Sequence, residues 1–137
     1  MESMTERMRK AGDALARLHE MVIMDHWNEV ERDALIHRFE FCFEIIWKCA
    51  KDYLSDVEFL NAASPRKVIR MSREVGLLTD EEAERALEMA NDRNLTSHMY
   101  DEQMALGLAE RIRGHEALMQ QWYQRMKSAE VAEKNQD

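Results

Sequence analysis

Apolar residues recur every three or four positions near the start of the chain, as on one face of an α-helix. This pattern predicts a helix over residues 3–25, with charged residues on its other faces. Residues 29–54 differ, because apolar side chains cover most of the helical circumference. A helix of this kind is buried on several sides, either at the centre of a bundle or also against a second subunit. The apolar seam of the first helix consists of Met4, Met8, Ala11, Leu15, Leu18 and Val22.

Helix-start and helix-stop signals divide the rest of the chain. Ser64 and Pro65 are an N-cap and a first helical residue, and Gly76 is typical of a helix end. Thr79 and Glu82 have the spacing of a capping box, which predicts a helix over residues 80–93. A bundle-type repeat then predicts a last helix over about residues 101–127. We expect residues 128–137 to form a polar, frayed tail.

The composition indicates an all-α protein. The 137 residues include only four glycines and one proline, and 45% are hydrophobic. We therefore expect one domain over residues 1–137, with its core over about 3–127. Its predicted architecture is an up-and-down helical bundle of about five helices, four long and one short, that forms a homodimer.

Other features of the sequence bear on the cellular location of the protein. It has no apolar run long enough to span a membrane, and its N-terminus is charged rather than signal-peptide-like. We expect a cytoplasmic protein without a membrane partner. Cys42 and Cys49 lie two helical turns apart, about 10 Å along the axis, which is too far for a disulfide. They are interpreted as reduced core residues.

The net charge of −8 argues against a dedicated nucleic-acid binder and suggests a basic partner, or a partner that covers an acidic surface. One basic cluster stands out on the third predicted helix. It could follow a phosphate backbone, or it could be an ordinary solvated face. Its residues are Arg66, Lys67, Arg70 and Arg73.

Chemically active side chains gather between the last two predicted helices. Arg93, His98 and Tyr100 form the pattern R-x4-H-x-Y. An arginine binds phosphate bidentately, and a histidine exchanges protons near neutral pH. Asp101 can restart a helix, which would place this break beside a helix N-terminus, a natural site for an anion.

A polar stripe on the second predicted helix has two interpretations. It is either a solvated face or one side of a groove in which Glu40 or Glu44 orients Arg93. The stripe consists of Asp33, His37, Glu40, Glu44, Lys48 and Lys51.

The motifs of metal hydrolases and phosphate-binding loops are missing from the sequence, and we expect no metal and no cofactor. Metal-independent RNA cleavage needs a base, an acid and a cation. One His and one Arg supply only part of this set, so the chemistry predicts a composite site across a two-fold axis. Gly107 and Gly114 lie two turns apart on one face, which makes a helix–helix contact across such a dimer plausible.

Three sequence blocks resemble the HEPN family, closest to its HepT branch. They are Arg38-Phe39-Glu40-Phe41-x-Phe43-Glu44-x-x-Trp47-Lys48, Ser64-Pro65-Arg66, and Asp92-Arg93-Asn94-x-x-Ser97-His98-x-Tyr100-Asp101. The resemblance covers about residues 5–127. It implies a dimeric helical bundle that acts as the RNase toxin of a pair with a minimal nucleotidyltransferase (MNT) antitoxin. It further implies that Arg93 and His98 carry the RNase site and that Tyr100 is where the antitoxin attaches AMP.

Three hypotheses follow. In the first, the chain is a metal-independent endoribonuclease with RNA and no DNA as substrate. His98 is then the acid/base, Arg93 holds the phosphate, and Asn94 and Ser97 shape the turn. In the second, the chain is a non-catalytic subunit that presents a substrate to the nucleotidyltransferase. In the third, it is a structural helical dimer whose Arg93 and Tyr100 make only buried hydrogen bonds.

Overall fold

The computed structural model describes residues 3–98 and 101–135, and the side chains of residues 3–98 and 101–129. Within these ranges the chain forms five α-helices and one short 3₁₀ helix, η1, and no strand. The elements are α1 (Met4–Val22), α2 (Glu29–Val57), α3 (Pro65–Glu74), α4 (Asp80–Leu95), η1 (Thr96–His98) and α5 (Glu102–Asn135).

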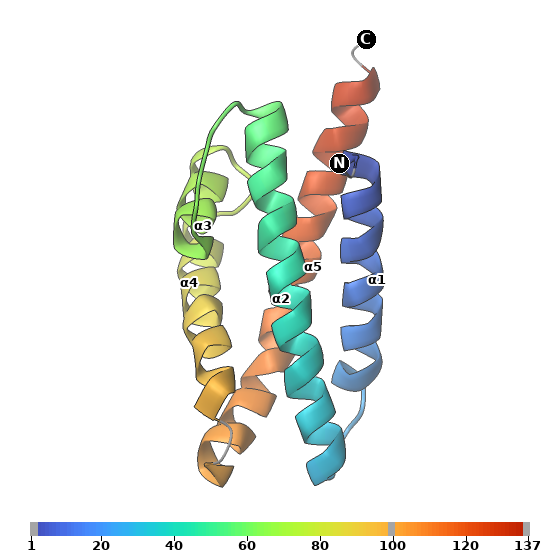
Figure 1. Ribbon diagram of the computed structural model, residues 1–137, viewed down its shortest axis with the longest axis vertical. Helices are drawn as coiled ribbons and strands as arrows, with labels where there is room; N and C mark the ends of the chain where they lie inside the picture. Colours follow the sequence, from blue (N-terminus) through green and yellow to red (C-terminus); the bar gives the residue numbers. More distant parts are fainter. Residues whose placement is uncertain (1–2, 99–100, 136–137) are drawn as a thin grey trace.

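The four long helices α1, α2, α4 and α5 alternate in direction, and the short α3 lies beside the upper part of α4 (Figure 1). α2 is the central element, since it packs against α1, α3 and α5 and also touches α4. The buried apolar residues form one continuous cluster that includes side chains from all five α-helices. The all-α, up-and-down bundle predicted from the sequence is therefore confirmed.

The local signals at the helix ends act as the sequence predicts. The Ser64 hydroxyl accepts a hydrogen bond from the Lys67 amide, and Thr79 and Glu82 form a reciprocal capping box. Gly76 ends the α3 segment with φ +84°, which glycine adopts without steric cost. The apolar seam of α1 faces the core, with Leu18 and Ala11 fully buried.

Three predictions about helix extent and burial were wrong. α5 does not end near residue 127 but continues to Asn135, because residues 128–135 are polar yet include strong helix formers such as Ala129. α2 ends at Val57 rather than residue 54. Its circumference is also less completely covered than its composition suggests, since Val30 and Phe41 are exposed.

Gly12 shows how closely α1 approaches α5. A Cβ at Gly12 would lie 2.7 Å from the Tyr123 hydroxyl oxygen of α5, so glycine at this position permits the contact. Cys42 and Cys49 are buried free thiols, as predicted. Within the described ranges, each helix is too short or too polar to cross a membrane.

Candidate functional site

Arg93 lies in the last turn of α4, and its guanidinium group points at two carboxylates of α2. Its Nε donates a hydrogen bond to Glu44 Oε1 at 3.1 Å, and its Nη2 lies 3.5 Å from Glu40 Oε1. The Arg93 side chain remains 27% exposed. Its Nη1 donates a long hydrogen bond to Thr96 Oγ1 at 3.5 Å. A guanidinium group has five N–H donors, so these three contacts orient the group and leave two N–H donors for an incoming anion.

The Glu44 carboxylate is itself held in place. Its Oε2 accepts a hydrogen bond from Trp47 Nε1 at 3.2 Å and lies 3.8 Å from Lys48 Nζ. Trp47 is buried, which leaves its indole little freedom to move. A rigid donor on one oxygen and Arg93 on the other therefore orient Glu44.

The turn after α4 is closed by hydroxyl groups. Thr96 Oγ1 donates to the Arg93 carbonyl at 2.7 Å, and Ser97 Oγ donates to the Asn94 carbonyl at 3.2 Å. These bonds satisfy carbonyl groups that the end of a helix leaves without backbone partners. His98 ends η1 and is exposed.

The far side of the turn is fixed by the start of α5. Asp101 Oδ1 accepts hydrogen bonds from the amides of Gln103 and Met104. Glu102 is held by a bidentate ion pair with Arg32 of α2, at 2.7 and 3.1 Å, and Arg32 is buried. Tyr100, the expected modification site, lies outside the described residues.

Asp92, the neighbour of Arg93 in sequence, contacts α5 rather than α2. Its carboxylate accepts two hydrogen bonds from Arg111 and lies 2.7 Å from His115 Nε2, both on α5. His115 is buried and stacks on Phe39. Burial alone would raise the pKa of Asp92, but the bonds to Arg111 and His115 hold that pKa below its ordinary value. This cluster anchors the end of α4 to α5.

The basic cluster of α3 is partly engaged within the protomer. Arg66 hydrogen-bonds to the side-chain amide of Asn91, and Arg73 lies 3.9 Å from Asp80. Lys67 and Arg70 are exposed.

The structure thus brings Arg93, Glu40 and Glu44 together. It places Asn94 next to Arg93 in the last turn of α4, and Ser97 and His98 in η1, which follows. The roles of Trp47, Thr96 and Asp92 could not be assigned from the sequence. The i, i+3 spacing of Glu44 and Trp47 was the available signal for the first of these. Among the described residues, no three His, Cys, Asp or Glu side chains are grouped as metal ligands would be.

A partly exposed arginine that is followed five residues later by an exposed histidine offers a group that can bind an anion and a group that can transfer a proton. The sequence profile of the family described as "Nucleotidyltransferase substrate binding protein like" matches residues 6–128. The chain belongs to this family. Comparison with curated proteins gave no match.

A Thermus thermophilus protein of known structure is 47% identical to this family member, with a TM-score of 0.83. The match covers 85% of this chain and 98% of that one. This identity over most of both chains shows that the two proteins are relatives with the same fold.

Two more distant structures share the fold. A Haemophilus influenzae protein, described as the substrate-binding domain of a nucleotidyltransferase, has 18% identity and a TM-score of 0.75, over 88% of this chain and 98% of that one. A tri-AMPylated HEPN toxin of Shewanella oneidensis, in complex with its MNT antitoxin, has 16% identity and a TM-score of 0.74, over 93% and 99%. These two structures confirm the fold that the resemblance implies, and the family match confirms the expected kinship with nucleotidyltransferase substrate-binding proteins.

Proposed function

We propose that this chain is the toxin of a HEPN/MNT toxin–antitoxin pair and acts in the cytoplasm as a metal-independent endoribonuclease. The observation that carries the proposal is the position of Arg93. Its guanidinium is fixed along one edge by Glu44 and Glu40, is partly open to solvent, and adjoins the turn that ends at His98. A buried, fully paired Arg93 would favour a purely structural role.

In this proposal Arg93 binds the scissile phosphate and His98 transfers the proton. Asn94 and Ser97 shape the turn that presents His98, consistent with the Ser97 hydroxyl bond to the Asn94 carbonyl. RNA rather than DNA is the substrate because the attacking group is the 2′-hydroxyl. Since each chain supplies only one His and one Arg of this set, the working site is composed of two copies in a homodimer.

The antitoxin acts on Tyr100 in this proposal, by attaching AMP. The added phosphate pairs with Arg93 and the adenosine blocks access to the site, as other charge-changing modifications do. The α3 cluster of Arg66, Lys67, Arg70 and Arg73 contributes to binding of the RNA backbone.

Growth arrest by matched histidine variants tests the catalytic proposal. His98→Ala should abolish the arrest that the wild-type chain causes when expressed alone, without lowering the melting temperature. His26→Ala is the control, because His26 is also exposed but lies in the connection between α1 and α2, outside the proposed site. Arrest by His98→Ala equal to that of the wild type would refute the assignment.

Intact mass tests the regulatory proposal. Each AMP attached on co-expression with the partner nucleotidyltransferase adds about 329 Da, the mass of an adenylyl group, a charged modification comparable to phosphorylation. Tyr100→Phe should remove the first increment. An unchanged mass pattern in that variant would place the modification elsewhere.

The second candidate is a non-catalytic subunit that presents a substrate to the nucleotidyltransferase. The description of the family favours it, because that description names substrate binding and no catalysis. It predicts a stable complex with the nucleotidyltransferase and no RNA cleavage by the purified chain. Cleavage that depends on His98 would exclude it.

A further inference from the structure

A large hollow lies away from Arg93, along the groove between α1 and α2. It has a volume of about 590 Å³, and α1 and α2 supply all of its lining residues. A second hollow of about 190 Å³ shares Ala14, Arg17 and Phe41 with it and extends the groove toward His37. From His37 to Asp52 the groove follows about 22 Å of α2, by helical rise.

The lining of this groove is richer in basic residues than the chain as a whole. The two hollows are lined by six Lys and Arg residues and two Asp residues, although the net charge of the chain is −8. Four of these cations, Arg7, Arg9, Arg38 and Lys48, pair with carboxylates of α1 and α2. The hollow beside α3 has two cations, Arg70 and Arg73, and two carboxylates, Asp80 and Glu84. By its lining residues, the α1–α2 groove therefore suits an anionic polymer better than that hollow does. Its basic residues are Arg7, Arg9, Lys10, Arg17, Arg38 and Lys48.

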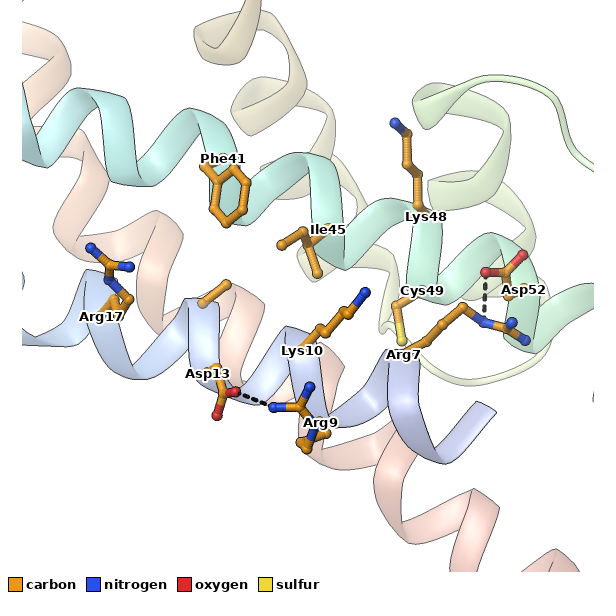
Figure 2. A pocket seen from close by; sticks show the side chains of 11 residues that line it. Arg7, Arg9, Lys10, Asp13, Arg17, Phe41, Ile45, Lys48, Cys49 and Asp52 are labelled. Atoms are coloured by element: carbon orange, nitrogen blue, oxygen red, sulfur yellow. Dashed lines mark hydrogen bonds and ion pairs between the residues drawn. The ribbon is translucent and has the colours of Figure 1, made fainter. Parts of the chain in front are cut away.

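The floor of the groove is apolar and presents an aromatic ring. Phe41 is 58% exposed, and Ile45 lies one turn further along α2 (Figure 2). Arg17 borders the same stretch from α1 and has no side-chain ion pair with any residue that the structure describes. Cations beside an exposed ring are what proteins use to bind single-stranded nucleic acid, because the ring stacks on a base while the cations pair with phosphates.

The groove is connected to the proposed reaction site across α2. Lys48 lines the groove, and its Nζ lies 3.8 Å from Glu44 Oε2, whose other oxygen accepts the bond from Arg93 Nε. An RNA strand that contacts Lys48 in the groove would thus be separated from Glu44, which orients Arg93, by that one side chain.

We propose that the α1–α2 groove binds a single-stranded segment of the RNA substrate, with Arg17 and Lys10 at its phosphates and Phe41 under a base. This rests on the proposed function, because it places the substrate of that site. The length of the groove favours a strand of several nucleotides over a free mononucleotide.

Binding of an uncleavable RNA analogue tests the groove separately from catalysis. The probe is a 5′-fluorescein-labelled 2′-O-methyl oligonucleotide of about 12 nucleotides, long enough to fill such a groove. Its affinity for the full chain is measured by fluorescence anisotropy over roughly 50 to 300 mM KCl. Arg17→Glu and Arg85→Glu are a matched pair, since both residues are exposed and both changes alter the net charge equally.

Arg17→Glu should weaken binding about tenfold and reduce the slope of log affinity against log salt by about 0.7, the loss of one phosphate contact. Arg85→Glu on α4 should change the affinity less than about twofold, since distant surface charges are screened. Phe41→Ala should weaken binding about fivefold by loss of stacking. Phe59→Ala, which removes another exposed ring, should not. Circular dichroism melts confirm that each variant folds.

Equal effects of Arg17→Glu and Arg85→Glu on probe binding would overturn the proposal. So would loss of binding only with Arg70→Glu on α3. A third contrary result is unchanged probe binding in Arg17→Glu while that variant disrupts a complex with another protein. The last would make the groove a protein interface. Cleavage that depends on His98 by a chain that does not bind the probe would refute the groove and leave the proposed function standing. Groove-dependent binding with cleavage unaffected by His98→Ala would do the reverse.

Discussion

α4 meets α5 and α2 through ion pairs of opposite polarity. Toward α5 it presents carboxylates, and Glu82 and Asp92 pair with Arg125 and Arg111. Toward α2 it presents Arg93, which pairs with carboxylates of that helix. The carboxylates on the α5 side are buried, whereas Arg93 is 27% exposed and Glu40 and Glu44 are 38% and 33% exposed.

The pairs made by the buried carboxylates hold α4 in place, whereas the partly exposed Arg93 is accessible to a ligand. A buried carboxylate with full hydrogen bonding fixes a helix, and losing one partner leaves an unpaired polar group in the interior. A half-exposed arginine contributes little to stability but stays available to a ligand. Asp92 and Arg93 are adjacent in sequence and serve these two purposes because they lie on opposite sides of α4.

The largest expected effect is on activity at the α2 side. Arg93→Ala should reduce RNA cleavage by about 10²- to 10³-fold, since it removes the cation at the phosphate. The free energy of unfolding should fall by less than about 1 kcal/mol, because the ion pairs are half-exposed. Cleavage assays and urea denaturation measure the two quantities. A large loss of stability would instead make Arg93 an anchor like Asp92.

The largest expected effect on stability is at the α5 side. Asp92→Ala should lower the free energy of unfolding by about 3 kcal/mol, because buried His115 loses its acceptor and Arg111 its partner. Urea denaturation of this variant beside Arg93→Ala provides the direct contrast. A smaller loss in Asp92→Ala than in Arg93→Ala would contradict the division between the two sides. Asp92→Asn, which retains an oxygen acceptor, should give an intermediate loss.

The pH dependence of stability should also follow the α5 side. Arg125 and the cap at Thr79 lower the pKa of Glu82 to about 2 from its ordinary 4.5. A lowered folded-state pKa gives stability that is complete above pH 4.5 and is lost as the pH falls toward 2. The melting temperature should therefore decline over this range, and Glu82→Gln should make the decline shallower. An equally steep decline in that variant would show that other groups control acid unfolding.

The smallest expected effects distinguish the two carboxylates of the α2 side. Glu44→Gln should reduce the cleavage rate about fivefold, since it removes one charge-assisted contact. Glu44 lies 3.1 Å from Arg93 Nε and is itself held by Trp47. Glu40→Gln, at 3.5 Å, should have a smaller effect. The ratio of the two cleavage rates is the readout. Wild-type rates in both variants would indicate that neither carboxylate orients Arg93.

Much of the fold could be predicted because its signals are local. The seam from Met4 to Val22, the Ser64-Pro65 start and the capping box at Thr79 each specify a helix face or end without tertiary information. The end of α5 is not evident from polarity, because residues 128–135 are polar yet include good helix formers. The start of α2 has a local signal of its own, the Asn28–Glu31 capping box.

The candidate site was only partly predictable. The spacing of Arg93 and His98 and the polar stripe with Glu40 and Glu44 were visible in the sequence. The pairing of Asp92 with His115 and of Arg32 with Glu102 was not, because each joins residues far apart in the chain whose charges alone allow many partners. The basic groove was hidden for the same reason, since its cations come from two helices.

The central claim is that two copies of Arg93 and His98 share one reaction site. RNA cleavage by dimers assembled from mixtures of wild-type and His98→Ala chains tests it most directly. If both histidines are needed, total activity should fall with the square of the wild-type fraction. Activity in direct proportion to that fraction would show that each chain works alone, and unchanged activity in His98→Ala alone would show that this histidine has no part in the chemistry.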